Sequence, residues 1–405
     1  MDLIAGHLLY QAIDLLLATA LWLACAALSR GAIGRRLLHR LPPWLGRAPR
    51  GEWLLAAALF VGGLGGVIFF GQSLVYPALD HLLQCHPDWQ RRLNVGAFLP
   101  LGIAWLGGTI VLPAAALRAA WSARRDRGLA AGFALAMATL LLLACIVEPD
   151  RVVVERRRVE VAGLPAGVEP LRVVLLSDLQ SSWLGPRERA LPARVAALRP
   201  DLIVVAGDLV AQSFDERTTL RQARHVLQGL VAAAPRLGVH VVNGDVDSVV
   251  HGGIAETIRG TGALLLDNQS VVLATEPPIE LLGIDPRRAG AMERALARAP
   301  RAAVRIGLVH RPRHWRDLAA AGCQLVLAGH THGGQVVIPG FGPPVTFEIV
   351  PRAVAAGGLH RMSDTTQLCV TRGLGKEGGF APQIRLFCPP EITLIEVTGA
   401  PMPPH

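Results

Sequence analysis

Four long apolar segments in the first 150 residues restrict the fold of this chain more than any other feature. A helix needs roughly 20 apolar residues to cross about 30 Å of hydrocarbon, and we predict an all-α transmembrane region of about four helices in residues 1–150. The chain is 51% hydrophobic and only 18% charged, which is less charge than the roughly 25% of soluble domains. The predicted spans are Ile4–Leu28, Trp53–Leu79, Leu93–Leu117 and Leu129–Val147.

The placement of arginines predicts how these spans are oriented. The connections Arg30–Arg50 and Arg118–Arg127 are rich in arginine, whereas Asp80–Arg92 balances two arginines with two aspartates. Basic loops stay on the cytoplasmic side, so the first and third connections are predicted to be cytoplasmic. Four spans then place everything after Val147 outside. We expect a multi-pass membrane protein with its second half on the non-cytoplasmic face.

The second half of the chain, residues 151–405, has the pattern of an α/β domain. Short β-rich runs alternate with segments at helical spacing, after a charged connector at Arg151–Gly163. The predicted strands are Arg172–Asp178, Asp201–Asp208, Val239–Asp245, Ile279–Asp285, Val304–His310 and Gln324–His330. The predicted helices are Arg187–Leu198, Glu216–Ala234, Ala289–Ala297 and Pro312–Ala321.

Five of the predicted strands end in a side chain that binds metals. A single strand-end Asp usually belongs to a turn or caps a helix. Side chains beyond the carboxyl ends of neighbouring strands converge in space, and carboxylates with imidazoles suit a hard or borderline divalent cation. The pattern therefore favours a metal site. The five residues are Asp178, Asp208, Asp245, His310 and His330.

The sequence gives little support to two other functional classes, nucleic-acid-binding proteins and transporters. The net charge is +9, but the arginines are scattered and aromatic residues make up only 5%, whereas nucleic-acid binding favours clustered basic residues beside aromatics. We therefore predict no nucleic-acid partner. The apolar segments show no set of charges that indicates a transport path, although a transporter role for the helical half stays an alternative. Asp14, in the first segment, is interpreted as an interfacial or helix-packing residue.

Seven short motifs then carry a resemblance to a known family. In order along the chain they are Ser177–Gln180, Gly207–Val210, Gly244–Asp247, Leu308–His310, Gly329–Gln335, Arg372–Gly375 and Arg385–Ile392. The first five resemble the calcineurin-like metallophosphoesterases, and Gly329–Gln335, which reads Gly-His-Thr-His-Gly-Gly-Gln, is the most specific. The last two resemble the bacterial membrane-associated branch of that family. The resemblance covers nearly all of the second half and leaves out the four apolar segments.

The resemblance implies a four-layer α/β/β/α sandwich and two divalent metal ions, of Mn, Fe, Zn or Mg, bridged by one Asp and a hydroxide. Asp208 matches the bridging carboxylate. Asp178 and His332 match ligands of the first metal, and His310 and His330 match ligands of the second. The full predicted ligand set is Asp178, Gln180, Asp208, Asp245, His310, His330 and His332.

Three positions depart from the family pattern. Gln180 stands where the family has His, and an amide oxygen is a weaker ligand for zinc-like metals, so the first site is expected to bind less tightly or to prefer Mn²⁺ or Mg²⁺. Asp245 stands where the family has Asn. Val246 replaces the family's His that protonates the leaving oxygen or stabilises the phosphorane, and losing one general acid costs roughly 10²–10⁴ in rate. His240 and His251 are candidates for a replacement acid.

These observations predict a membrane-anchored, metal-dependent phosphoesterase. The resemblance to a bacterial branch implies a bacterial plasma membrane, with the second half of the chain on its periplasmic face. The expected reaction is hydrolysis of a phosphoester or pyrophosphate bond, with a lipid-linked or cell-envelope substrate. Asp208, Asp245 and Arg372 are the predicted catalytic residues. Arg372 either clamps phosphate oxygens through its planar guanidinium or forms a structural ion pair. The alternative function is a catalytically impaired homologue that binds metal or phosphate without turnover.

Overall fold

The computed structural model describes most of the second half of the chain. The chain divides into two compact units, Met1–Thr139 and Leu140–His405, whereas we predicted the boundary after residue 150. The first three predicted spans and most of the fourth lie outside the described residues. Among the described residues, no helix has the length and apolar character to cross a bilayer. The described residues are 139, 142–165, 167, 169–180, 184–211, 216–288, 290–296, 304–344, 346, 348–377 and 384–399.

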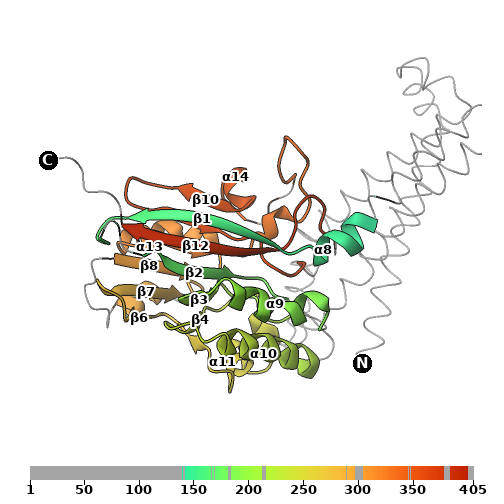
Figure 1. Ribbon diagram of the computed structural model, residues 1–405, viewed down its shortest axis with the longest axis horizontal. Coiled ribbons are helices and arrows are strands. Elements are labelled where there is room, and N and C mark those ends of the chain that lie inside the picture. Colours follow the sequence, from blue (N-terminus) through green and yellow to red (C-terminus); the bar gives the residue numbers. More distant parts are fainter. Residues whose placement is uncertain are drawn as a thin grey trace, which may run out of the picture. The chain divides into compact units, whose positions relative to one another are not determined.

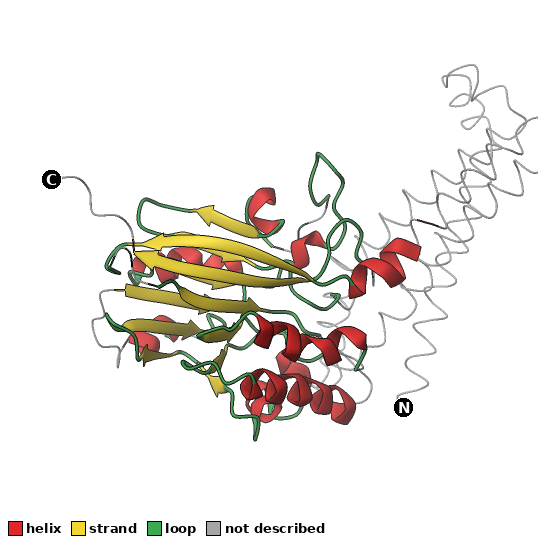
Figure 2. Cartoon of the chain, viewed as in Figure 1, coloured by secondary structure: helices red, strands yellow, loops and turns green. Residues whose placement is uncertain are grey.

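Two six-stranded mixed sheets form the centre of the second unit (Figures 1 and 2). The first sheet has the order β1 (Val153–Val161), β12 (Glu391–Gly399), β2 (Leu171–Leu176), β3 (Leu202–Val205), β4 (Val239–Val241) and β5 (Leu264–Leu265). The second has the order β10 (Gly358–Arg361), β11 (Gln367–Val370), β9 (Leu325–Ala328), β8 (Val304–Val309), β7 (Ile279–Ile284) and β6 (Gln269–Leu273). Strands β2 to β5 run parallel to one another, as do β7, β8, β9 and β11.

Three hydrophobic cores stack these elements into four layers. Successive side chains of a strand point to opposite faces of its sheet: Val173 and Leu175 of β2 pack between the two sheets, whereas Val174 and Leu176 pack toward helices. The helices on the first sheet are α9 (Pro186–Ala197), α10 (Glu216–Ala232) and α11 (Gly253–Ile258). Those on the second are α12 (Ala291–Leu296), α13 (Trp315–Ala320) and α14 (Arg352–Ala355). The expected α/β/β/α sandwich is confirmed.

The six predicted strands and four predicted helices are all present with shorter or shifted ends. The connector prediction at Arg151–Gly163 was wrong, because this segment forms β1, the edge strand of the first sheet. Its alternating exposed positions carry Arg156, Arg158 and Glu160. Charged side chains are common on edge strands because they discourage further strand pairing, and here they concealed the strand.

A short helical segment leads into β1. It consists of a π-helical stretch, η2 (Leu143–Val147), and one turn, α8 (Glu148–Asp150). Strand β1 runs parallel to β12, and β12 runs antiparallel to β2. Helix α8 therefore lies at the end of the sandwich where β2 finishes, as Figure 1 shows. The Arg385 backbone N–H donates to the Ala144 carbonyl at 2.9 Å, which attaches this segment to the sandwich.

Candidate metal centre

The predicted ligands lie in loops at the carboxyl ends of β2, β3, β4, β8 and β9. Five of the site residues have a left-handed backbone, which is uncommon outside glycine and gathers at functional sites where the surrounding fold enforces it. Each chain segment turns sharply just past its strand and directs a polar side chain to the same place. The five residues with their φ angles are Asp178 (53°), Gln180 (38°), Asp208 (55°), His330 (72°) and His332 (48°).

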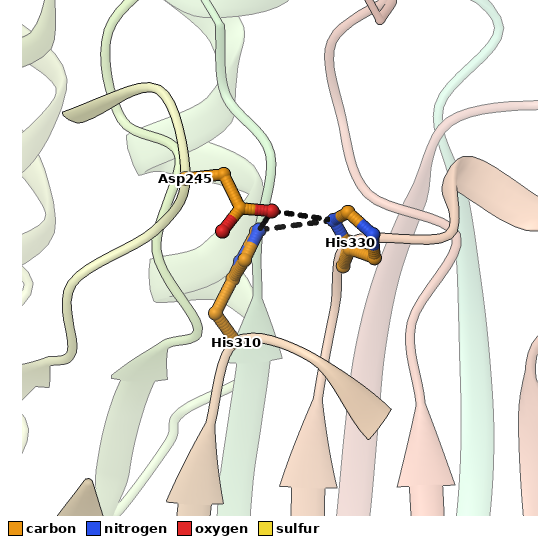
Figure 3. Close-up of side chains that lie close together, drawn as sticks. All are labelled: Asp245, His310 and His330. Carbon is orange, nitrogen blue, oxygen red and sulfur yellow. Dashed lines mark hydrogen bonds and ion pairs between the residues drawn. The ribbon is translucent and has the colours of Figure 1, made fainter. Parts of the chain in front are cut away.

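One group of possible ligands consists of Asp245, His310 and His330 (Figure 3). Asp245 Oδ2 lies 3.2 Å from His330 Nδ1 and 3.6 Å from His310 Nε2. The two ring nitrogens are 3.2 Å apart. The potential ligand atoms of the group all lie within 4.8 Å of one another, so one carboxylate and two imidazoles meet at a single point. Such a set suits a borderline or hard divalent cation.

A second hydrogen bond fixes the orientation of the His310 ring. His310 Nδ1 donates to the Ala206 carbonyl at 2.7 Å, and Nε2 therefore faces Asp208 Oδ2 at 3.3 Å. Metal-binding histidines usually donate their other ring nitrogen to such a partner. Nε2 is therefore the ring nitrogen left to bind a cation once it gives up its proton; in the metal-free site burial opposes protonation, but Asp208 and Asp245 hold the pKa of His310 above its ordinary value.

The other group consists of Asp178, Asp208 and His310, which are all buried. Next to it, His332 Nε2 lies 3.5 Å from Asp178 Oδ1. Three buried atoms here have no hydrogen-bond partner within the described residues: Asp178 Oδ1, Gln180 Oε1 and His332 Nε2. Leaving such atoms unpaired costs free energy, and all three are metal-ligating atoms. The residues therefore fit a bound cation, and the two groups together fit a dimetal site.

A backbone amide holds the Asp208 carboxylate beside His310, the residue that the two groups share. Its Oδ1 accepts the Val246 N–H at 2.9 Å, so Val246 serves the site through its main chain. His310 lowers the pKa of the Asp208 carboxyl, against the opposing effect of burial. The Asp208 N–H in turn donates to the buried carboxylate of Asp247 at 2.9 Å. Burial and the nearby Asp208 charge raise the pKa of Asp247 to about 6.

Two arginines accompany Asp245, the residue that stands in place of the family's Asn. Arg311 Nη2 lies 2.6 Å from Asp245 Oδ2, and Arg287 Nη1 lies 3.7 Å from Oδ1. Burial opposes ionisation of this carboxyl, but hydrogen bonds from His310 and His330, with Arg311, hold its pKa far below the ordinary value. The additional negative charge of Asp245 is thus matched by additional positive charge.

Three other predicted candidates lie in structural contacts. Arg372 forms ion pairs with Glu391 at 2.8 Å and Glu155 at 2.9 Å, which is the ion-pair alternative of the sequence interpretation, and its catalytic role stays a prediction. His240 is buried in β4 and donates from Nε2 to the Leu237 carbonyl, which precedes the strand. That bond directs the ring away from the carboxyl ends of the strands. The backbone N–H of His251, an exposed residue, donates to Glu216.

Besides Arg287, sequence reasoning assigned no role to several other residues that contact the site. Asp247 follows Gly244 by three positions. An Asp at this spacing commonly accepts a hydrogen bond from a nearby loop amide, so its role could have been predicted. Arg385 opens the motif Arg385–Ile392, but the motif indicated no role for it at the site. Nothing in the sequence pointed to Arg311 and Glu377, because their partners come from distant segments. Arg311 contacts Asp245, Glu377 lies 3.2 Å from His332 Nε2, and the fully buried Arg385 approaches His332 Nδ1 at 3.5 Å.

Comparison with known proteins identifies the family, although no family model matches the chain. The chain is 31% identical over 237 residues to Phosphodiesterase YaeI of Escherichia coli, covering 56% of this chain and 82% of that protein. It is 27% identical to the uncharacterized metallophosphoesterase YkuE of Bacillus subtilis, covering 61% of this chain and 86% of YkuE. It is also 29% identical to a bovine transmembrane protein with metallophosphoesterase domain, covering 74% of this chain and 68% of that protein.

A four-layer sandwich with carboxylate and histidine ligands at its strand ends defines the metallophosphoesterase class. The similarity to the E. coli phosphodiesterase spans most of that relative. The chain belongs to the calcineurin-like metallophosphoesterase family.

Proposed function

We propose that the protein is a metal-dependent phosphoester hydrolase, acting on a phosphomonoester, phosphodiester or pyrophosphate bond. The observation that carries the proposal is that two ligand groups adjoin at His310, which both contain, with Asp208 Oδ2 at 3.3 Å from its Nε2. Paired divalent cations supply Lewis acidity toward a phosphoryl oxygen and a hydroxide near neutral pH. The E. coli relative is named a phosphodiesterase, which makes a phosphodiester the first substrate to test.

The residues around the centre support this chemistry in distinct ways. Asp208 and Asp178 bring negative charge that holds cations, and their burial keeps water from competing for it. The Gln180 amide donates to Asp208 Oδ2 at 3.4 Å. Arg311 is partly exposed beside Asp245, where its planar guanidinium can bind phosphate oxygens in two places. We propose that Arg311, rather than Arg372, contacts the substrate.

A non-catalytic metal- or phosphate-binding module is the second candidate function, and Val246 favours it. The family's acid would extend from this position, but a valine side chain has no proton to give. The described site offers no other histidine at that place, because His240 is held within the sheet. A substrate with a good leaving group needs little help from an acid, and such a substrate distinguishes the two functions.

We propose further that the enzyme works at a membrane on a lipid-linked or envelope phosphate. Exposed apolar side chains lie on loops beside the site and on the segment before α8: Ile338, Phe341, Ile349, Phe387, Leu142 and Ile146. The Val337 N–H donates to the Leu386 carbonyl and the Arg385 N–H donates to Ala144, so these loops and the predicted end of the fourth span adjoin. Exposed apolar patches commonly mark membrane or ligand contacts.

Relatives support the membrane proposal independently. The similarity to the bovine transmembrane protein covers 74% of this chain, whereas Leu140–His405 makes up only two thirds of it. The similarity therefore extends into the half that carries the predicted spans. Reporter fusions at His405 and within Arg30–Arg50 test the predicted periplasmic side: activity of a periplasm-dependent reporter at His405 alone supports it, and activity in the Arg30–Arg50 loop alone refutes it.

Activity is tested on the purified full-length chain with Mn²⁺ and an activated aryl phosphodiester. Turnover that disappears in Asp208→Asn supports the hydrolase. A folded, Mn²⁺-loaded chain without turnover supports the binding module instead. The double variant Gln180→His with Val246→His is expected to raise turnover about tenfold or more, because it restores the family's imidazoles. Unchanged turnover in the double variant contradicts the assignment of these two positions.

A further inference from the structure

The predicted ligands of the first metal, Asp178, Gln180 and His332, have an additional carboxylate beside them that the family pattern does not supply. Glu377 lies in the loop that follows Arg372–Gly375. Its Oε2 is 3.2 Å from His332 Nε2 and 3.4 Å from Gln180 Nε2. The Glu377 backbone N–H donates to Gln335 Oε1 at 2.8 Å, which holds this loop against the turn that carries His332. The carboxylate thus lies beside both His332 and Gln180, two predicted ligands of the first site.

The nitrogen that Glu377 faces shows what the carboxylate is placed to do. A carboxylate that merely orients a metal-binding histidine meets the ring nitrogen pointing away from the metal, as the Ala206 carbonyl does for His310. Glu377 instead meets Nε2 of His332, the nitrogen that also faces Asp178 Oδ1 at 3.5 Å. The far nitrogen, Nδ1, faces Arg385. Glu377 is therefore on the metal-facing side of the ring.

We propose that Glu377 is a ligand of the first metal and replaces the imidazole lost at Gln180. The buried Asp178 Oδ1 and Gln180 Oε1 have no hydrogen-bond partners within the described residues, and His332 Nε2 faces the carboxylates of Asp178 and Glu377. A cation among these atoms would bind all of them. Glu377 is partly exposed, with 22% of its side-chain surface accessible, so it can move a short distance toward the cation. This inference rests on the proposed function in one respect: both require a centre that binds two metal ions.

The proposal has a consequence for metal choice. Glu377 makes the first site rich in oxygen, because carboxylates and an amide then outnumber the single imidazole of His332. Oxygen-rich sites suit Mn²⁺ or Mg²⁺, whereas imidazole-rich sites suit Zn²⁺. The second site keeps two imidazoles, those of His310 and His330. The two sites are therefore expected to differ in metal preference within one centre.

The test measures Mn²⁺ binding to the full-length chain by titration, with electron paramagnetic resonance to distinguish coupled pairs from single ions. Wild type is expected to bind two Mn²⁺ ions with a coupled signal. Glu377→Gln is expected to weaken the first site at least tenfold and to leave a single-ion spectrum. Glu293→Gln, an exposed glutamate on α12, is the matched control and is expected to bind as wild type does.

Rescue separates ligation from a general effect on folding. The double variant Glu377→Gln with Gln180→His is expected to regain two ions and to prefer Zn²⁺ over Mn²⁺ at the first site. Two coupled Mn²⁺ ions in Glu377→Gln, or a double variant that stays at one ion, overturns the proposal. If the wild-type chain shows no turnover but its Mn²⁺ binding still depends on Glu377, the proposed hydrolase function is refuted. The assignment of Glu377 as a ligand is then still supported.

Discussion

Replacement of Asp247 by asparagine tests how the fold positions the bridging carboxylate. The buried Asp247 carboxylate accepts four backbone N–H groups. Its Oδ2 accepts from Asp208 at 2.9 Å and Gly244 at 2.8 Å, and its Oδ1 accepts from Leu209 at 2.8 Å and Val210 at 3.4 Å. Asparagine keeps one acceptor oxygen and turns an NH₂ group toward the other two donors.

The expected loss of stability follows from the two backbone N–H donors that would face the NH₂ group of the asparagine. Each buried donor left without an acceptor costs about 1–3 kcal/mol, so Asp247→Asn is expected to lose about 2–6 kcal/mol of local stability. A loss of about 2 kcal/mol corresponds to about 30-fold in an equilibrium constant. Hydrogen–deuterium exchange at the amides of Asp208 and Gly244 in metal-free protein is therefore expected to rise at least about 30-fold.

An exposed aspartate provides the comparison. Asp317 on α13 is largely exposed and contacts only His314 within the described residues, so Asp317→Asn is expected to change stability by less than about 0.5 kcal/mol. Exchange at Asp208 and Gly244 that is the same in Asp247→Asn as in wild type would refute the reasoning. It would mean that the Asp247 carboxylate does not hold the loop.

Three further predictions concern metal, packing and pH. Mn²⁺ at about 100 times its dissociation constant should stabilise wild type by about 2.7 kcal/mol, seen as a higher melting temperature, and Asp208→Asn should lose most of the rise. Gly329→Ala would place a Cβ 1.9 Å from Ser177 Oγ and should cost about 1–3 kcal/mol; a melting temperature equal to wild type contradicts this. Burial lowers the pKa of His240, so the unfolded chain takes up a proton first and stability falls as pH drops below about 6.5. In His240→Gln the melting temperature should fall less steeply with decreasing pH. An unchanged pH dependence of the melting temperature would contradict this role of His240.

The strand and helix pattern of the second unit was largely predictable from the sequence. Buried runs such as Ile279–Ile284 and Val304–Val309 are continuous apolar segments with both faces covered, and such runs are typical of interior strands. Strand β1 was not predictable, because an edge strand buries little of its surface and its charged residues imitate a loop. Strand β12 pairs with both β1 and β2, a position that depends on contacts from the opposite end of the domain.

The candidate site likewise contains some residues that could be predicted from the sequence and others that could not. Asp178, Asp208, His310 and His330 could be found from the sequence because each follows a strand whose pattern is visible locally. Glu377 and Arg311 could not, because neither lies in a recognisable motif and their partners are brought near by the packing of separate loops. The ion pairs of Arg372 with Glu155 and Glu391 depend likewise on β1 and β12 lying side by side.

The α/β character of the second half, the ligand types and the family could be inferred from the sequence, because strand periodicity and short motifs are local properties of the chain. The three-dimensional packing was needed to find which nitrogen of His332 faces Glu377, which arginines pair with Asp245, and how Asp247 holds the loop that carries Asp208. These are distances between atoms of different loops. They are fixed by the packing of two sheets around a common core, which no local pattern specifies.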